Sequence, residues 1–213
     1  MPGFYTWRII KGVEEQIVEE IISDLYLTSD DFISVNHYIA YRAVMSHGKP
    51  LATGYCTKEA KKYKQAFADH VREEVKRQGY NLKPTKEQHF YVDCVFYFPM
   101  LRMDCNNYFK CMLDAITDTQ LVWIDDNVVC ERVQRIYYDS KSPRIELHIH
   151  PVDYIGIFDN MSQLDEFISN NCVVCNRHNR NCSILAKAKA GKIQEEIKDM
   201  ECLKRNGENN NGK

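Results

Sequence analysis

Acidic, amide and lysine side chains gather in two short segments near the middle of the chain. Asp104, Asn106 and Lys110 lie within seven residues, and Asp125 and Asp126 follow in the next loop. Carboxylate and amide oxygens are the ligands that hard cations such as Mg²⁺ prefer, and phosphate chemistry needs such a cation together with positive charge. The residue types and their spacing therefore predict a metal-dependent enzyme that acts on phosphodiesters.

The first segment is expected to open a helix over 106–117, just after a strand. Asp104 and Asn106 are two positions apart, so in an extended segment both side chains point to the same side and can reach one ion. The helix start offers backbone N–H groups and the positive end of the helix dipole to a phosphate oxygen. Lys110 can approach the same phosphate and stabilise the charge that develops on phosphorus.

Asp125 and Asp126 follow Trp123 and Ile124 in a tight loop before the next strand, where they can complete a metal shell. Each pattern taken singly is commoner as plain structure. An Asp-x-Asn pair before a helix is usually a cap, and an Asp-Asp-Asn run is usually a turn. The prediction of chemistry therefore depends on the whole pattern.

The whole pattern extends over the runs 104–110, 113–116, 122–129 and 144–147. It resembles the RusA-type Holliday junction resolvases, which are crossover junction endodeoxyribonucleases. Their motif is D-x-D-N-x-x-K, a helix like Leu-Asp-Ala-Leu, a D-D-x-x-V run after an apolar or aromatic residue, and two strands. A looser match at 34–38 extends the resemblance to about residues 34–150.

The resemblance implies a homodimer that binds four-way junction DNA in recombination and repair. It also implies paired nicks in strands of like polarity, dependent on Mg²⁺ or Mn²⁺, because a dimer places two sites across one junction. The catalytic residues by match are Asp104, Lys110 and Asp126. The metal ligands would be Asp104, Asn106, Asp125 and Asp126, and the supporting residues Asn107 and Asp114.

Asn106 departs from the family motif, which has a carboxylate at this position. An amide oxygen can bind Mg²⁺, but it adds no negative charge and cannot act as a base. Three interpretations stay open: a natural variant in which another carboxylate such as Asp125 or Asp114 compensates, a junction binder with little activity, or an engineered mutant.

Basic residues are unevenly distributed in a chain whose net charge is −2. Residues 42–86 hold eleven bases and four acids, an excess of seven, which can create a basic face for a polyanion. A solvated helix surface is the plain alternative. The candidates for phosphate contacts are Arg42, Lys58, Lys61, Lys62, Arg102, Arg132, Arg135 and Arg144. Tyr38, Tyr41 and Tyr55 are candidate wedges between bases, although a core or rim role is commoner.

Four soft or borderline ligands lie within eleven residues near the C-terminus: Cys172, Cys175, His178 and Cys182. Their spacing suits a tetrahedral structural Zn²⁺, with Cys202 as a possible replacement for His178. An iron–sulfur cluster and plain reduced cysteines are the alternatives. The odd total of nine cysteines argues against a disulfide framework.

The elements that must position these groups fit an α+β fold with a mixed β-sheet and packed helices, plus a helical C-terminal extension that carries the cysteine cluster. Helices are expected over 13–27, 58–78 and 106–117, with a helical run over 183–203. Strands are expected over 89–98, 128–138 and 143–150, and a strand or loop over 34–48. Thr57 should cap the helix over 58–78 and Gly79 should end it.

Three regions follow from this pattern: an N-terminal helical addition over 1–33, a nuclease core over 34–158, and an extension over 159–213 whose tail is disordered from about 206. The N-terminus lacks the basic and apolar regions of a signal peptide, and no apolar run has membrane-spanning length. These observations predict a soluble, cytoplasmic protein without a membrane partner.

Two function classes other than a nuclease stay open. A non-catalytic module could bind DNA junctions through its bases, with Asn106 marking a weakened metal site. A small regulatory zinc protein would explain the C-terminal segment, but it leaves the acidic segments unexplained. Dependence of activity on Asp104 and Asp126 would distinguish the nuclease from the binding module.

Overall fold

The structure is a computed structural model, which describes residues 5–10, 13–18, 21–86 and 88–205. The chain divides into two compact units, Met1–Pro151 and Val152–Lys213. The tail that is expected to be disordered lies outside the described residues. No helix in the described part of the chain is long and apolar enough to cross a membrane.

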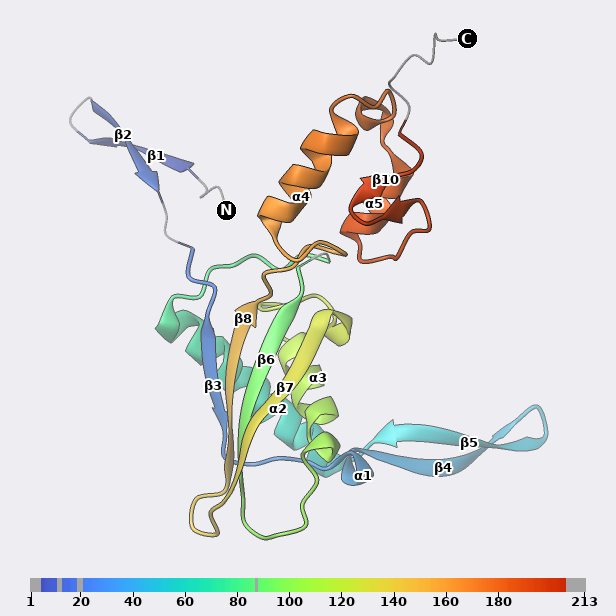
Figure 1. The fold of residues 1–213 in the computed structure, drawn as a ribbon. Helices are drawn as coiled ribbons and strands as arrows, with labels where there is room; N and C mark the ends of the chain where they lie inside the picture. The colour runs from blue at the N-terminus through green and yellow to red at the C-terminus, as the bar shows by residue number, and fades with distance from the viewer. Residues whose placement is uncertain (1–4, 11–12, 19–20, 87, 206–213) are drawn as a thin grey trace, which may run out of the picture. The chain divides into compact units, whose positions relative to one another are not determined.

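A four-stranded sheet organises the first unit, in the order β3-β8-β6-β7 (Figure 1). The edge strand β7 runs parallel to β6, whereas β8 is antiparallel to both β6 and β3, so the sheet is mixed. The strands are β3 (Leu25–Ser29), β6 (Phe90–Phe98), β7 (Val129–Tyr138) and β8 (Arg144–Pro151). The predicted α+β class and the three predicted strands are confirmed.

Two helices pack on the same side of the sheet, α2 (Lys58–Gln78) and α3 (Phe109–Thr117) (Figure 1). Their buried residues include Phe67, Val71 and Leu113, which join the alternate residues of β6 and β8 in one core. Each such side chain contributes roughly 1.5–3 kcal/mol when it is fully buried. The Thr57 hydroxyl accepts a hydrogen bond from the Ala60 N–H (3.2 Å), and Gly79 has φ 68°, so both predicted caps of α2 are confirmed.

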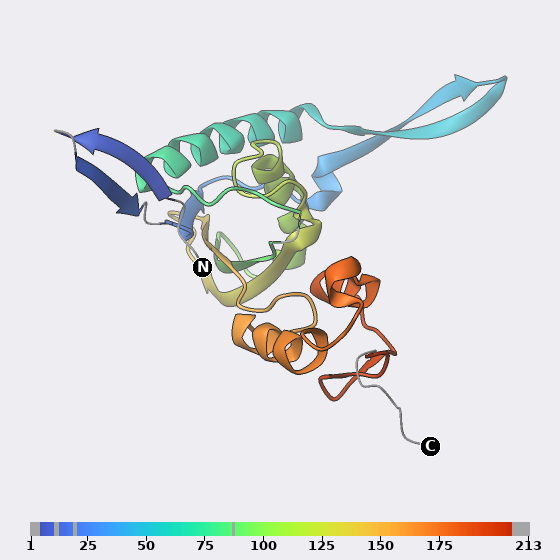
Figure 2. The ribbon, with the colours of Figure 1, turned by 90° about the horizontal axis from the view of Figure 1, so that it is seen from above.

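The segment between β3 and α2 forms a short helix and a hairpin instead of an irregular stretch. Helix α1 (Val35–Tyr38) leads directly into β4 (Ile39–Ser46), which pairs with β5 (Lys49–Cys56) in a separate two-stranded sheet. Figure 2 shows this hairpin leaving the body of the unit near the start of α2. The strand expected within 34–48 is confirmed from Ile39, and its partner strand was not expected.

The helix predicted over 13–27 is wrong. Residues Val13–Val18 form β2, which pairs with β1 (Tyr5–Ile10), and the next described element is β3. Leu25 and Leu27 are buried while Tyr26 is exposed, which is the alternation of a strand. Pairing of Leu25 and Leu27 with Ile149 and Leu147 of β8 overrides the helical spacing of the local sequence.

The second unit is built from short elements around a small core. They are α4 (Met161–Phe167), a π-helix η3 (Ile168–Cys172), a 3-10 turn η4 (His178–Arg180), α5 (Ser183–Lys189), and a minimal hairpin of β9 (Ile197–Lys198) and β10 (Glu201–Cys202). The helical run predicted over 183–203 is therefore wrong beyond Lys189, because Gly191 takes φ 75° and closes α5. The domain boundaries expected at residues 33 and 158 stay predictions.

Candidate active site

The acidic segment lies where the chain crosses from β6 to α3. Asp104 caps the 3-10 turn η1 (Cys105–Asn107) and accepts a hydrogen bond from the Asn106 N–H (3.1 Å). Asp104 and Asn106 are both exposed, and Asn107 is half-buried within the turn. The cap therefore fixes the backbone at Asn106 within η1, four residues before Lys110.

Lys110 joins the two acidic segments of the sequence. Its Nζ lies 2.8 Å from Asp114 Oδ1 and 3.1 Å from Asp126 Oδ2. The hydrogen bond to Asp114 is the largest cause that raises the pKa of Lys110 above its usual value, and Asp126 adds to it. The ammonium group is thus held charged between two carboxylates.

Tyr38 fixes Asp114 from the other side. Its hydroxyl donates to Asp114 Oδ2 (2.5 Å), and the ring is buried, with 8% of its surface exposed. Burial raises the pKa of Tyr38, and the bond to Asp114 raises it further, so this hydroxyl stays a donor. The structure places Tyr38 in the core rather than on a surface that faces bases. No local sequence pattern predicts its bond to Asp114, because the two residues are 76 positions apart.

The loop before β7 is anchored so that Asp126 meets Lys110. Trp123 is fully buried, and its indole N–H donates to Thr117 Oγ1 at the end of α3 (2.7 Å). Asp125 caps the 3-10 turn η2 (Asp126–Val128) by accepting from the Asn127 N–H (2.9 Å). These contacts tie the loop to α3 and give Asp126 its position.

An open pocket between α3 and β7 brings these groups together. Its polar lining consists of Asn106, Lys110, Asp126 and Glu131, and its apolar walls are Phe109, Leu113 and Val133. Asp104 and Asp125 are not among the described residues that line it. Glu131 is a carboxylate that the sequence interpretation missed, although its place two residues into the strand after the Asp pair puts it on the same face as Val129 and Val133.

The donor set of this pocket fits a hard divalent cation. Asp126 and Glu131 offer carboxylate oxygens and Asn106 offers an amide oxygen, which suit Mg²⁺ or Mn²⁺ and do not suit a soft metal. Lys110 adds a positive charge to the same pocket. These are the types of group that metal-assisted cleavage of a phosphodiester uses.

The predicted basic residues fall into separate groups. Lys58, Lys61 and Lys62 are exposed at the start of α2, and Arg42 is exposed on the adjoining hairpin, where its guanidinium lies 5.6 Å from the Tyr55 ring centre. Arg102 is exposed in the loop before Asp104, with φ 69°. None of these five residues belongs to the four-stranded sheet, and all five are exposed.

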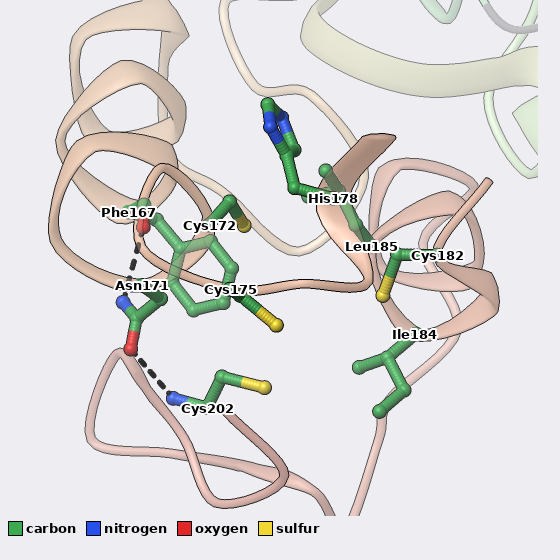
Figure 3. A pocket seen from close by; sticks show the side chains of 9 residues that line it. All are labelled: Phe167, Asn171, Cys172, Cys175, His178, Cys182, Ile184, Leu185 and Cys202. Carbon is green, nitrogen blue, oxygen red and sulfur yellow. Dashed lines mark hydrogen bonds between the residues drawn. The ribbon is translucent and has the colours of Figure 1, made fainter. Parts of the chain in front are cut away.

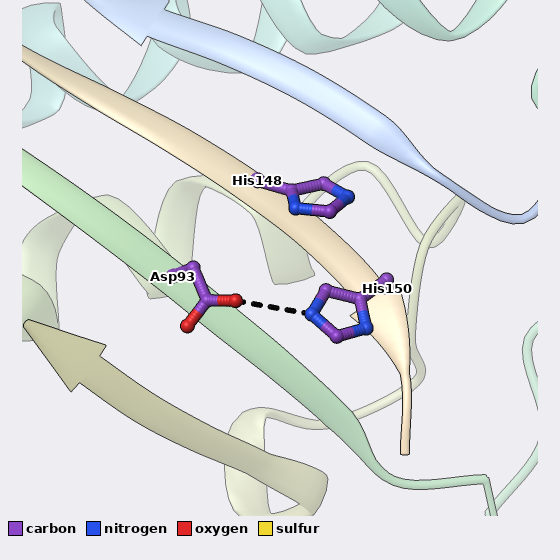
Figure 4. A group of neighbouring side chains, drawn as sticks. All are labelled: Asp93, His148 and His150. Atoms are coloured by element: carbon purple, nitrogen blue, oxygen red, sulfur yellow. Dashed lines mark hydrogen bonds and ion pairs between the residues drawn. The ribbon is translucent and has the colours of Figure 1, made fainter. Parts of the chain in front are cut away.

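Arg132, Arg135 and Arg144 lie on the sheet face opposite α2 and α3. Arg132 binds Asp93 through two hydrogen bonds and stacks over Tyr91 (3.6 Å). Asp93, His148 and His150 gather on this face, and His150 Nε2 lies 3.0 Å from Asp93 Oδ2 (Figure 4). Since Arg132 already saturates Asp93, this group is an ion-pair network rather than an open cation site.

Arg135 and Arg144 also engage neighbours on that face. The Arg135 guanidinium lies 5.2 Å from the Tyr137 ring centre. Arg144 pairs with Glu146 (2.8 Å) and with Asp139 (3.5 Å), and it stacks over Tyr97 (3.5 Å). Three of the eight predicted phosphate contacts are therefore turned away from the pocket.

The C-terminal candidates belong to the second unit. Cys172, Cys175, His178 and Cys182 line one small cavity there, and Cys202 joins them (Figure 3). All nine cysteines of the chain have free thiols.

A comparison with models of protein families tests the family membership that these residues suggest. The family model of Endodeoxyribonuclease RusA matches residues 40–150, which is 111 of 213 residues. The chain belongs to the RusA endodeoxyribonuclease family. The match contains Lys110, Asp114, Asp126 and Glu131, so the whole pocket lies within the RusA region. No curated protein matches the chain.

Proposed function

We propose that this RusA-family chain is an Mg²⁺-dependent, structure-selective endonuclease that resolves four-way DNA junctions in recombination and repair. The observation that carries the proposal is the position of Lys110 between Asp114 and Asp126, beside a pocket that also holds Asn106 and Glu131. This arrangement unites positive charge for a phosphate with oxygen ligands for a metal.

The metal would be held by Asp126, Glu131 and Asn106, with Asp104 and Asp125 as the further ligands expected from the family motif. When bound, Mg²⁺ supplies an activated water and neutralises charge on the scissile phosphate. Manganese is the alternative ion, because it also prefers oxygen ligands.

Lys110 is the catalytic cation of the proposal. Its ammonium group lies at the pocket wall, where it can hold a non-bridging phosphate oxygen and stabilise the charge that grows there during attack. Asp114 orients the lysine by a hydrogen bond across one helical turn, and Tyr38 orients Asp114. Asp114 and Tyr38 are therefore positioning residues.

Glu131 can compensate for the carboxylate that the family motif has at the position of Asn106. The change from carboxylate to amide removes one negative charge from the motif, and Glu131 restores one in the same pocket. Asp114 is a poor substitute, because both of its oxygens are occupied by Tyr38 and Lys110. This supports a natural variant with a substituted ligand over a chain that has lost its chemistry.

Affinity for the junction is proposed to come from Lys58, Lys61, Lys62 and Arg42, whose charges are exposed near the hairpin and the start of α2. Contacts to phosphate give most of the affinity and make it depend on salt. A homodimer would present two pockets to one junction, and paired nicks follow from that symmetry.

The test is cleavage of an end-labelled synthetic four-way junction, with the matching linear duplex as control, in Mg²⁺ and in EDTA. We expect paired nicks in the junction alone, lost in EDTA and in Asp126→Asn, and retained in Asp165→Asn, a control on the exposed surface of α4. Tight junction binding without nicks under all conditions would favour a non-catalytic binding module. A protein that neither binds nor cleaves the junction would refute the proposal.

A further inference from the structure

We propose that the second unit binds a structural Zn²⁺ through four cysteines, Cys172, Cys175, Cys182 and Cys202. This set replaces His178, which the sequence spacing had favoured, with a cysteine 20 residues beyond Cys182. The site lies in the second unit and is independent of the proposed nuclease function.

The four thiols come from separate elements and line one small cavity. Cys172 ends η3, Cys175 lies in the turn after it, Cys182 precedes α5, and Cys202 lies on β10. Figure 3 shows the sulfur atoms of Cys175, Cys182 and Cys202 turned toward one another, whereas the ring of His178 points away from them. The side-chain directions therefore favour a ligand set of cysteines alone.

Local backbone structure suits a metal-binding turn. The Cys175 N–H donates to the Cys172 carbonyl (2.9 Å), and the His178 N–H donates to the Cys175 carbonyl (3.0 Å). The chain thus turns tightly between the first two thiols, as the Cys-x₂-Cys spacing of structural zinc sites requires.

Asn171 brings Cys202 to the same place. Its side-chain amide donates to the carbonyls of Phe167 (3.0 Å) and Met200 (3.1 Å), and its Oδ1 accepts from the Cys202 N–H (2.9 Å). Asn171 is buried, with 5% of its surface exposed. A buried amide that makes two of its three hydrogen bonds to the β9–β10 hairpin holds Cys202 near Cys172 and Cys175.

The second unit needs such a cross-link. Its buried core is small, consisting of Phe158, Leu164, Phe167, Cys172 and Ala188, and its hairpin has two residues in each strand. Cores of this size supply too little free energy to hold a unit of this length, and small natural domains add disulfides or a metal. A tetrahedral zinc site would join α4, α5 and the hairpin at one point.

The sulfur atoms surround the cavity without meeting at one point. Within the described part of the chain, the group of Asp93, His148 and His150 is the one set of three potential ligand atoms that lie within 4.8 Å of one another. Zinc binding would therefore draw the thiolates inward to Zn–S distances of about 2.3 Å.

The first experiment measures the metal content of the full-length chain after purification without chelator. We expect about one zinc per chain by mass spectrometry of the metals, as a closed structural site requires. Replacement by Co²⁺ should give the intense thiolate charge-transfer band and the long-wavelength d–d bands of a four-thiolate site. A chain without zinc that develops no such bands, or one that contains iron, would overturn the proposal.

Two matched variants test the ligand set. Cys202→Ser should weaken zinc binding by at least about tenfold and shift the Co²⁺ bands to shorter wavelength, because one thiolate is lost. His178→Gln should leave both unchanged. The reverse result would restore His178 as the ligand. If Cys202→Ser fails to fold, the Co²⁺ spectrum of the unchanged protein still decides between three and four thiolates.

Discussion

Tyr38 donates a hydrogen bond to Asp114 across 76 positions of sequence, with 2.5 Å between the two oxygens. The other oxygen of Asp114 accepts from Lys110, which also reaches Asp126. A chain of hydrogen bonds therefore runs from the segment before the β4–β5 hairpin to the loop before β7. It fixes the ammonium group of Lys110 at the pocket. The position of this group therefore depends on Tyr38, which lies next to the hairpin.

Replacing Tyr38 with Phe should loosen this support without removing the ring from the core. A buried hydrogen bond to a charged group contributes about 1.5–3 kcal/mol, so the free energy of unfolding should fall by about that amount. Cleavage should slow severalfold at saturating junction, with the binding constant unchanged. Urea unfolding and single-turnover cleavage measure the two effects.

Tyr41→Phe is the matched control, because Tyr41 is 74% exposed on β4. It should change neither the stability nor the cleavage rate. A loss of stability in Tyr38→Phe with full cleavage would show that the hydrogen bond is structural alone and that Lys110 needs no help in its position.

Lys110→Met should abolish most of the cleavage. The substitution keeps an unbranched side chain, one atom shorter, and removes the charge. Loss of one such stabilising group costs about 10²–10³ in rate. Junction affinity in Ca²⁺ should change less than about threefold, because one phosphate contact among many is lost. Lys141→Met, in the turn before β8, is the control. An equal loss of affinity and rate would assign Lys110 to binding.

The sequence predicted the elements that are fixed by strong local patterns. Alternation placed β6 and β8, and the Thr57 cap with Gly79 bounded α2 to the residue. The Asp-x-Asn and Asp-Asp segments lie on either side of α3 as expected, but α3 begins at Phe109 and not at residue 106, because a 3-10 turn precedes it. These features depend on residues that are close in sequence, so they can be predicted before the fold is known.

Features fixed by distant contacts were missed. Strand β3 depends on pairing with β8, more than 100 residues later, so its own helical spacing misled the prediction. The packing of strands and helices likewise determines three other features: the bond between Tyr38 and Asp114, the place of Glu131, and the orientation of Arg132 toward Asp93. The roles expected for Asp104 and Asp125 stay predictions.

Glu131→Gln should weaken metal binding at the pocket. Loss of one carboxylate ligand should raise the Mg²⁺ concentration for half-maximal cleavage by about tenfold or more, as removal of a supporting metal contact typically does. Glu73→Gln, on the exposed face of α2, is the control. The test is a Mg²⁺ titration of cleavage at saturating junction.

Asn106→Asp in the Glu131→Gln background should restore much of that loss, because it returns the carboxylate of the family motif to the same pocket. A double variant as weak as Glu131→Gln alone would show that the two positions do not share an ion. It would also remove the argument that Glu131 compensates for Asn106.

Arg132→Met should lower the stability of the fold at neutral pH and remove part of its dependence on acid pH. The Arg132 guanidinium holds the pKa of the Asp93 carboxyl well below its usual range, and Gln134 and His150 add to this. The pair therefore stabilises the fold fully above the unfolded pKa of about 3.9, and this stability is lost as the pH falls toward the lowered folded value. The variant should lose about 1–2 kcal/mol at pH 7.

The difference between the two proteins should shrink below about pH 4, where the unfolded chain takes up the proton. Circular dichroism across an acid titration measures it, with Arg135→Met as control, since that guanidinium packs over Tyr137 on the same face. A stability difference that does not change with pH would mean that Arg132 acts by packing over Tyr91 and not through its charge.

Lys58, Lys61 and Lys62 should contribute to junction affinity through phosphate contacts. Each substitution by Gln should lower the affinity for junctions of any sequence and reduce the slope of log K against log salt by about 0.9. The cleavage rate at saturating junction should stay unchanged, because these residues do not line the pocket. Fluorescence anisotropy at several salt concentrations measures the slope.

Lys76→Gln provides the control on the same helix, because Lys76 is exposed at the far end of α2, about four turns from Lys62. If junction DNA lies along the start of α2, the control keeps the full salt slope and the three lysine variants do not. Equal losses at both ends would mean that the helix acts through its overall charge. A slope that no lysine variant changes would move the DNA to another surface, and Arg42 and Arg102 would then be the next residues to replace.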